Sequence, residues 1–248
     1  MLSLAKPEVL VMRSPNSAAE RPRHTEMRKI RVGVRSRALI LLMRLALKPV
    51  LRQISGADVS RILRHQAWLV RRLPKQSAGL SVHRRKWGAV PSICLGGAID
   101  VQRPVVLYLH GGAFIMPVLP QHIGFHARLC RDLDALGVMP EYRLAPTHPY
   151  PAALDDCEAV YRALLQAGVR SDRIVVVGES AGGNLTLGLL QRLRRLDLPM
   201  PACAVAISPV TELANLLELP SRKGNRRRDP LIPLEGIARM LELYSHSG

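Results

Sequence analysis

The sequence predicts an α/β fold with a mostly parallel sheet flanked by helices. From about residue 80 onward, apolar stretches of strand length alternate with longer amphipathic stretches at short spacing. Continuous apolar runs such as Arg103–His110 indicate strands that are buried on both faces, as in parallel sheets. The chain has 248 residues, of which 48% are hydrophobic, so it is long enough for one large domain with a core.

The expected elements follow one another in a regular order. Strands are indicated by β-branched and apolar runs, and helices by apolar residues at helical spacing. Pro151 near its start and Gly168 after its end delimit one of the helices. In chain order we expect strands at 80–87, 89–97 and 103–110, a helix at 124–137, a strand at 138–142, a helix at 151–168, a strand at 173–180, a helix at 181–196 and a strand at 202–208.

The N-terminal third differs in composition from the rest. Residues 1–27 combine prolines, serines and charges without periodicity, so we expect a disordered basic tail there. Residues 28–79 are expected to form a helical cap segment, with basic amphipathic helices at 28–52 and 57–73. Residues 80–248 then form the core domain. The two helices fit either of two places, the surface of a membrane or the mouth of the domain that follows.

The positive charge is concentrated near the N-terminus. Residues 1–90 hold 20 Lys or Arg and 4 Asp or Glu, so this part carries 16 of the 17 net positive charges. Such an arm favours anionic surfaces, and residues 28–52 are the candidate contact with an anionic membrane. No aromatic residues alternate with the arginines and no recognition motif accompanies them, so we expect no nucleic-acid partner. The alternative is that arginine simply fills solvent-exposed positions.

The cysteines and the longest apolar run indicate the compartment. Cys94, Cys130, Cys157 and Cys203 are far apart and form no zinc motif, which predicts free thiols in a reducing compartment and no metal site. The apolar stretch Ala38–Leu51 is interrupted by charges and by a proline, so it is too short to span a bilayer. We expect a cytoplasmic protein without a signal peptide or a transmembrane helix, whose basic arm can associate with membranes.

Residues 178–182, GESAG, have the G-x-S-x-G pattern of a nucleophile elbow. A β-branched run precedes them and a helical pattern follows. Gly178 and Gly182 fit positions where strand and helix approach too closely for side chains. The turn would hold Ser180 at the helix N-terminus, where amides and the helix dipole favour negative charge. Ser180 is therefore the candidate catalytic nucleophile; the alternative is a glycine-rich turn with a structural serine.

A second motif, HGGAF at 110–114, follows an expected strand. A tetrahedral oxyanion needs two or three fixed backbone amides, and a loop of small residues supplies them without blocking the substrate. His110 and Gly111 open the motif, and we expect His110 to anchor the loop rather than to act in catalysis. The expected oxyanion-hole donors are the amides of Gly112, Ala113 and Ala181.

Four stretches occur in order at sensible spacing: HGGAF, EYRLAPTHPYPAALDDC, DRIVVVGESAGGN and ISPVTEL. Together they resemble the bacterial hormone-sensitive-lipase-like family of α/β-hydrolases, which are carboxylesterases and lipases with an HGGG oxyanion loop and a GDSAGG-type elbow. The resemblance covers Val82 to the C-terminus. It implies the α/β-hydrolase fold, a small-molecule acyl ester as substrate, an acyl-serine intermediate, and no metal or cofactor. It also implies that the N-terminal helices and the segment near 211–245 cover the acyl pocket.

Several residues depart from the family pattern. Ala113 replaces the third glycine of the oxyanion loop but keeps its amide. Glu179 stands for the usual Asp of the elbow, and Glu141 for the Asp before YRLAP. Met116-Pro117 replaces a turn glycine. Pro140 removes a hydrogen-bond donor from a strand that should be central.

The other members of a catalytic triad are not found in the sequence. In this fold the order is Ser, then Asp or Glu, then His, and the family's acid and histidine follow a seventh and an eighth strand. No stretch resembling either strand is present, so we expect a chain shortened at its C-terminus without the triad Asp and His. His246, the only histidine after Ser180, is the fallback base. Asp155 and Asp156 are expected to be first-turn partners of a helix dipole rather than catalytic acids.

The sequence therefore predicts a carboxylic-ester hydrolase of the esterase or lipase type. One alternative is a catalytically dead fragment or pseudoenzyme, and another is a basic surface-binding protein. The strand at 202–208 would lie at an open sheet edge, which predicts dimers or aggregates formed through that edge.

Overall fold

The computed structural model describes residues 33–48, 79–98, 100–213, 217–225, 229 and 233–245. The tail expected at 1–27, the helix expected at 57–73 and the fallback base His246 lie outside the described residues.

A six-stranded sheet forms the centre of the molecule, in the order β1-β2-β4-β3-β5-β6. Only β2 runs against the others, because its pairings with β1 and β4 are antiparallel and all other pairings are parallel. The predicted α/β class with a mostly parallel sheet is therefore confirmed. The strands are β1 (Val82–Trp87), β2 (Val90–Leu95), β3 (Val105–Leu109), β4 (Leu136–Pro140), β5 (Ile174–Glu179) and β6 (Cys203–Ile207).

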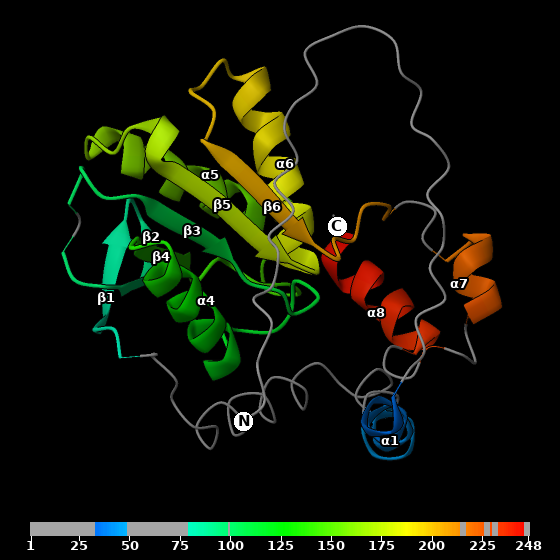
Figure 1. Cartoon of the computed structure of the whole chain (residues 1–248). Coiled ribbons are helices and arrows are strands. Elements are labelled where there is room, and N and C mark those ends of the chain that lie inside the picture. Colours follow the sequence, from blue (N-terminus) through cyan, green and yellow to red (C-terminus); the bar gives the residue numbers. More distant parts are fainter. Residues whose placement is uncertain are drawn as a thin grey trace, which may run out of the picture.

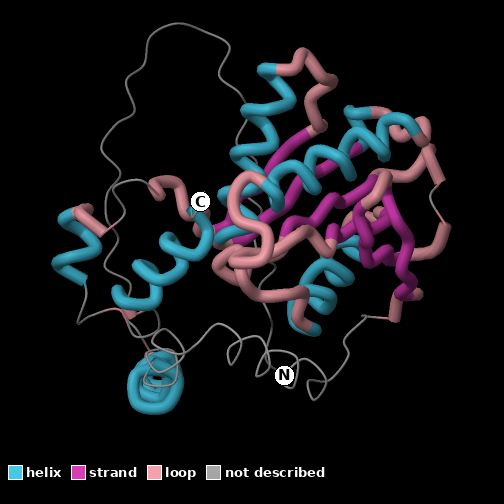
Figure 2. Tube along the Cα trace, turned by 180° about the vertical axis from the view of Figure 1, so that it is seen from behind, coloured by secondary structure: helices cyan, strands magenta, loops and turns pink. Residues whose placement is uncertain are grey.

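Helices cover both faces of the sheet (Figures 1 and 2). Helix α4 packs on one face, while α5 and α6 pack on the other. Helix α8 lies at the carboxyl ends of β5 and β6 (Figure 1). The helices are α4 (Pro120–Asp132), α5 (Ala152–Gln166), α6 (Ala181–Arg195), α7 (Pro220–Asn225) and α8 (Leu234–Ser245), with a 3₁₀ turn η2 (Ser171–Arg173) before β5.

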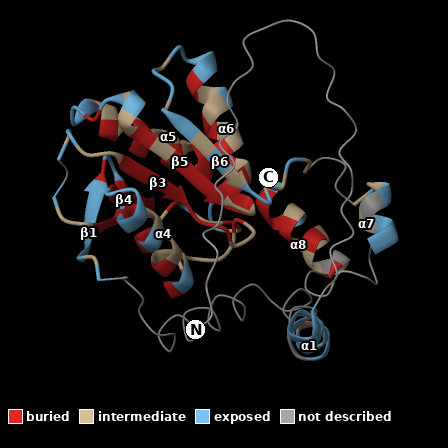
Figure 3. Ribbon diagram, viewed as in Figure 1, coloured by how far each residue is buried: buried red, intermediate tan, exposed pale blue. Residues whose placement is uncertain are grey.

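The central strand β3 explains how the two faces are filled. Successive side chains of a strand point to opposite faces. The odd-numbered residues of β3 join the core beneath α5 and α6, and the even-numbered residues join the core beneath α4. All five are at most 1% exposed, which accounts for the uninterrupted apolar run (Figure 3). They are Val105, Val106, Leu107, Tyr108 and Leu109.

Helix α4 begins four residues earlier than predicted. The sequence pattern indicated a helix at 124–137, whereas the helix runs from Pro120 to Asp132. Pro120 occupies the first helical position, where its missing N–H costs nothing. His122 Nδ1 accepts the backbone N–H of Leu119 at 3.0 Å, which secures the helix start. The N-cap residue is Leu119, and its N–H is bonded by the His122 side chain. Neither residue is a usual capping residue, so the sequence pattern did not mark this helix start.

Strand β4 also begins earlier than predicted. The expected strand was 138–142, whereas β4 starts at Leu136, because Leu136 and Gly137 pair with β3. A Cβ at Gly137 would lie 2.8 Å from both Cys130 Sγ and His126 Cε1, so α4 packs too closely for a side chain there. The parallel pairing with β3 ends at Val138, two residues before Pro140. Pro140 lies in a central strand, opposite Ser92 of β2, so its missing N–H leaves β4 without a donor there, as the sequence indicated.

One N-terminal helix is described, α1 (Val34–Leu42), and the π-helical turn η1 (Met43–Leu47) continues it. Both lie inside the predicted helix at 28–52. Helix α1 stands apart from the sheet (Figure 1). No helix in the described part of the chain is long and apolar enough to cross a membrane. The division into tail, cap segment and core stays a prediction.

Candidate active site

Ser180 lies in a strained turn between β5 and α6. Its φ of 55° and ψ of −117° fall outside the regions that L-residues usually adopt. Two backbone hydrogen bonds tie the turn to the segment after β6. The N–H of Ser180 donates to the Ile207 carbonyl at 2.9 Å, and the N–H of Val210 donates to the Ser180 carbonyl at 3.3 Å. The ISPVTEL stretch therefore fixes the backbone of the elbow.

The two glycines of the elbow are required by close packing, as predicted. A Cβ at Gly182 would lie 1.9 Å from the Leu109 carbonyl oxygen and 2.6 Å from that of His110. A Cβ at Gly178 would lie 2.2 Å from the Gly182 carbonyl oxygen. The first turn of α6 thus presses directly against the end of β3, and this contact brings the elbow to the loop that follows β3.

The loop after β3 offers backbone amides at this place. Among the described residues, the N–H groups of Gly112 and Ala113 have no hydrogen-bond acceptor. The Gly112 carbonyl accepts the N–H groups of Ile115 and Met116 at 3.1 and 2.9 Å, which closes the loop as a tight turn. Gly112, Ala113 and Phe114 all have positive φ. Ala181, the third expected donor, is the first residue of α6, where N–H groups have no partner within the helix.

His110 is occupied by structural contacts. Its ring is 1% exposed and stacks on Tyr142, with centroids 4.2 Å apart. Nδ1 donates to the Gly111 carbonyl at 2.7 Å, and the Tyr142 hydroxyl donates to the His110 carbonyl at 2.7 Å. Burial lowers the pKa of His110 to about 3, so the imidazole is neutral at pH 7. These contacts suit an anchor of the loop.

A carboxylate that sequence reasoning had not placed in the site lies between the two motifs. Glu179 Oε1 accepts the backbone N–H of Gly111 at 2.5 Å. His122 Nε2 lies 3.6 Å from the same oxygen. Burial raises the pKa of Glu179. The one signal in the sequence was the departure from the family's Asp at this position.

No described residue forms a hydrogen bond with the Ser180 hydroxyl. Ser180 is half-buried. His122 and His126 are held by Leu119 and by the Val106 carbonyl. The described histidines are His83, His110, His122, His126 and His148.

Asp155 and Asp156 form ion pairs with arginines. Asp156 accepts both the backbone N–H of Arg143 at 2.8 Å and its guanidinium at 2.8–3.0 Å. Asp155 pairs with Arg192 of α6. Both lie at the start of α5 as expected, but these partners lie in other segments. No group of three His, Cys, Asp or Glu in the described part of the chain could hold a metal ion, and the four cysteines are free thiols.

Residues 106–248, more than half of the chain, match the model of a family described as the alpha/beta hydrolase fold. The chain belongs to this family. Within it, this α/β-hydrolase is one of the bacterial hormone-sensitive-lipase-like group, as the following relatives show.

Three curated relatives are hydrolases by name. The acetyl-hydrolase of Streptomyces hygroscopicus is 37% identical over 139 residues, which are 56% of this chain and 46% of that protein. Carboxylesterase/phospholipase LipF of Mycobacterium tuberculosis is 46% identical over 121 residues, 47% of this chain and 31% of LipF. Esterase LipU of the same organism is 38% identical over 161 residues, 65% of this chain and 50% of LipU. The chain spans half or less of the length of these relatives.

Solved structures agree with this assignment. The hormone-sensitive-lipase homologue EstE7 from a metagenome library is 31% identical, with a TM-score of 0.71 over 85% of this chain and 68% of EstE7. EstE5 is 28% identical, with a TM-score of 0.73 over 86% of this chain and 69% of EstE5. The predicted family and fold are therefore confirmed.

Proposed function

We propose that this α/β-hydrolase cleaves carboxylic esters through an acyl-serine intermediate. Ser180 is the nucleophile, and the amides of Gly112, Ala113 and Ala181 form the oxyanion hole. The observation that carries the proposal is the strained Ser180 at the N-terminus of α6, packed against a loop whose amides lack acceptors among the described residues. The names of the relatives, which include acetyl-hydrolase, carboxylesterase and esterase, support an ester substrate.

The proposed reaction has two halves. A base takes the proton from Ser180 Oγ, and Oγ forms a bond to the ester carbonyl carbon. The carbonyl oxygen becomes an oxyanion that accepts hydrogen bonds from the backbone amides. The bond to the alcohol oxygen then breaks, and the alcohol leaves with the proton. Water attacks the acyl-serine in the same way, releasing the carboxylic acid and restoring the serine.

The remaining role in this reaction is that of the base. The candidate base, His246, lies outside the described residues. Where no base acts, binding and oxyanion stabilisation alone leave roughly 10³–10⁴-fold catalysis over water, so we expect slow turnover of short p-nitrophenyl esters. A catalytically dead protein is the alternative, and it would be favoured if Ser180 did not react with any acyl-mimicking reagent.

A fluorophosphonate tests Ser180 without needing an efficient base. We expect slow labelling that is lost in Ser180→Ala. The control variant Ser171→Ala should keep it, because Ser171 lies in η2, before β5, whereas Ser180 follows β5. Equal labelling of Ser180→Ala would remove Ser180 from the role of nucleophile. Hydrolysis of p-nitrophenyl butyrate, an ester with which EstE5 crystals were soaked, is measured in parallel. Robust turnover that is lost in His246→Ala would show that the tail supplies the base.

A second proposal concerns helix α1, for which we propose contact with an anionic lipid surface. Five large apolar side chains of α1 and η1 are 56–83% exposed (Figure 3). At 100° per residue, Val34, Leu41 and Leu45 share one side of the helix, whereas Leu39 and Leu42 lie away from it, so α1 is not the amphipathic helix that the sequence predicted. The exposed Arg35 and Arg37 lie among these apolar side chains, a combination that suits the boundary between headgroups and acyl chains. The exposed apolar residues are Val34, Leu39, Leu41, Leu42 and Leu45.

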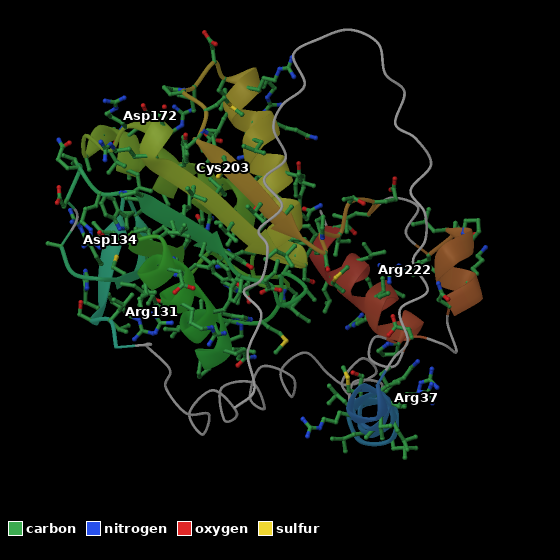
Figure 4. All side chains as sticks on the ribbon, viewed as in Figure 1. Arg37, Arg131, Asp134, Asp172, Cys203 and Arg222 are labelled. Carbon is green, nitrogen blue, oxygen red and sulfur yellow. The ribbon has the colours of Figure 1, made fainter. Side chains whose placement is uncertain are left out.

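Vesicle binding tests this contact. We expect the protein to sediment with vesicles containing phosphatidylglycerol but not with pure phosphatidylcholine, and we expect salt to weaken the binding. Arg35→Gln/Arg37→Gln should reduce binding, whereas Arg131→Gln, an exposed arginine on α4, should not. Figure 4 shows Arg37 and Arg131 on separate parts of the molecule. Equal binding to both kinds of vesicle, or an equal loss in the control variant, would contradict the proposal.

A further inference from the structure

The side chain of Glu179 joins the two halves of the candidate site. Glu179 ends β5 and directly precedes Ser180. Its carboxylate reaches the loop after β3, where Oε1 accepts the N–H of Gly111 at 2.5 Å. The two residues are 68 positions apart in the chain. One side chain thus links the nucleophile elbow to the oxyanion loop.

The Glu179 carboxylate explains why position 111 is a glycine. A Cβ at Gly111 would lie 2.3 Å from Glu179 Oε2, 2.6 Å from Oε1 and 2.7 Å from Cδ. The φ of Gly111 is not among the positive values of the chain, so the backbone conformation does not demand glycine. The space taken by the Glu179 carboxylate does demand it.

Two other side chains lie near the carboxylate. The Tyr108 phenol lies close enough to the carboxylate for each group to shift the pKa of the other, and His122 Nε2 lies 3.6 Å from Oε1. Tyr108 belongs to β3 and His122 to α4, so the carboxylate is approached from two further elements. The Glu179 side chain is 27% exposed. A carboxylate that accepts a backbone N–H makes a charge-assisted bond, which is stronger than a neutral one.

The bond to Gly111 decides which amides remain for an oxyanion. The Gly111 amide is used by Glu179, whereas the amides of Gly112 and Ala113 have no acceptor among the described residues. Ala113 and Phe114 have φ values of 56° and 62°. Such left-handed backbone in residues other than glycine persists only where surrounding contacts enforce it. The Glu179 bond is one such contact, at the start of the loop.

We propose that Glu179 is a positioning residue that holds the oxyanion loop by its Gly111 amide and keeps the next two amides in register with Ser180. This inference rests on the proposed function of Ser180. A glutamate reaches farther than the aspartate that is usual at this position of the elbow. The length of the Glu179 side chain therefore matters for its contact with the Gly111 amide.

Three substitutions of Glu179 separate the effect of its hydrogen-bond acceptor from the effect of its side-chain length. Glu179→Gln keeps an oxygen that accepts the Gly111 N–H, Glu179→Asp shortens the reach, and Glu179→Ala removes the acceptor. We expect fluorophosphonate labelling of Ser180 to slow about tenfold or more in Glu179→Ala and Glu179→Asp, since a single oxyanion donor is worth roughly 10²–10³-fold. Glu179→Gln should stay within a few-fold of the unsubstituted chain. Glu158→Gln on α5 is the matched control and should label at the normal rate.

Amide hydrogen exchange of the peptide 111–116 gives a readout that does not depend on Ser180. We expect faster exchange there in Glu179→Ala and Glu179→Asp, and unchanged exchange in Glu179→Gln and Glu158→Gln. Circular dichroism establishes that each variant is folded. If Glu179→Ala does not fold, Glu179→Gln, which retains the acceptor, is still compared with Glu179→Asp, which displaces it.

The outcomes are distinguishable. If the unsubstituted chain is not labelled, the proposed function fails, and the exchange comparison alone then decides the role of Glu179. If exchange of 111–116 is the same in Glu179→Ala, Glu179→Asp and the unsubstituted chain, the positioning role is overturned. A Gly111→Ala substitution adds a second test. It should slow labelling by itself but have no further effect in the Glu179→Ala background, because the clash and the anchor are then both gone.

Discussion

The ring of Tyr244 stacks on the ring of Phe114, with centroids 3.7 Å apart and planes 9° apart. Phe114 directly follows Ala113 in the oxyanion loop and is fully buried, and Tyr244 of α8 is 3% exposed. The Tyr244 carbonyl also accepts the N–H of Tyr150 at 2.8 Å. Helix α8 therefore packs against the oxyanion loop through Tyr244.

The first prediction concerns this stack. Tyr244→Ala should lower the free energy of unfolding by about 3–5 kcal/mol, the usual cost of removing a buried aromatic ring. The same change should speed amide exchange of Phe114. Tyr244→Phe keeps the ring and should cost less than about 1.5 kcal/mol. Urea denaturation measures both. Equal stability of Tyr244→Ala and the unsubstituted chain would mean that α8 does not support the loop.

The second prediction concerns acid. Burial lowers the pKa of His126 to about 4 from 6.5, and its Nε2–H donates to the Val106 carbonyl at 3.0 Å. The unfolded chain therefore binds a proton between pH 6.5 and 4 that the folded chain does not. Stability is full above pH 6.5 and falls as the pH drops through this window, by up to about 3 kcal/mol for this residue. The buried His110 and the partly buried His122 act in the same direction.

Urea midpoints measured between pH 4 and 8 check the second prediction. The slope of stability against pH should be smaller in His126→Gln, because that side chain does not titrate. His83→Gln, on the exposed surface of β1, is the control and should keep the full slope. A stability that is independent of pH down to pH 4 would show that these histidines ionise in the folded protein.

The third prediction compares the two aspartates at the start of α5. Asp156 is 7% exposed and holds both the backbone and the guanidinium of Arg143. Asp156→Ala should cost about 2 kcal/mol, because buried hydrogen bonds to a charged group are lost. Asp155→Ala breaks a more exposed pair with Arg192 and should cost about 1 kcal/mol or less. Thermal unfolding ranks the two, and a reversed order would contradict this account.

The sequence predicted the fold and the backbone of the site, but not the side-chain contacts that hold them. Strand runs, the elbow and the HGGAF loop are local patterns, and they predicted that Ser180 would lie in a tight turn after a strand. The contact of Glu179 with Gly111 spans 68 residues and depends on how α4, β3 and β5 pack, so no local pattern encodes it. The same is true of the pairs made by Asp155 and Asp156, which were expected to interact with their own helix. The early start of α4 was missed because its cap is made by His122.

The last prediction concerns the edge of the sheet. In the described part of the chain β6 pairs only with β5, and Cys203, Val205 and Ile207 are exposed on one side of it (Figures 3 and 4). Val205 is 45% exposed and Ile207 38%. An apolar strand with unpaired N–H and C=O groups is a template for pairing with another chain. We therefore expect the 248-residue chain to self-associate through β6.

A charged side chain on the strand should weaken this association. Val205→Lys adds a positive charge at the middle of the edge, and lysine on an edge strand opposes pairing. We expect a higher fraction of monomer by analytical ultracentrifugation, and less dye binding to exposed apolar surface. Met200→Lys is the control, because Met200 is 44% exposed but lies before the strand. A monomeric unsubstituted chain with a sharp, cooperative thermal transition would rule out association through β6, because a monomer of that stability would require the edge to be covered by the chain itself.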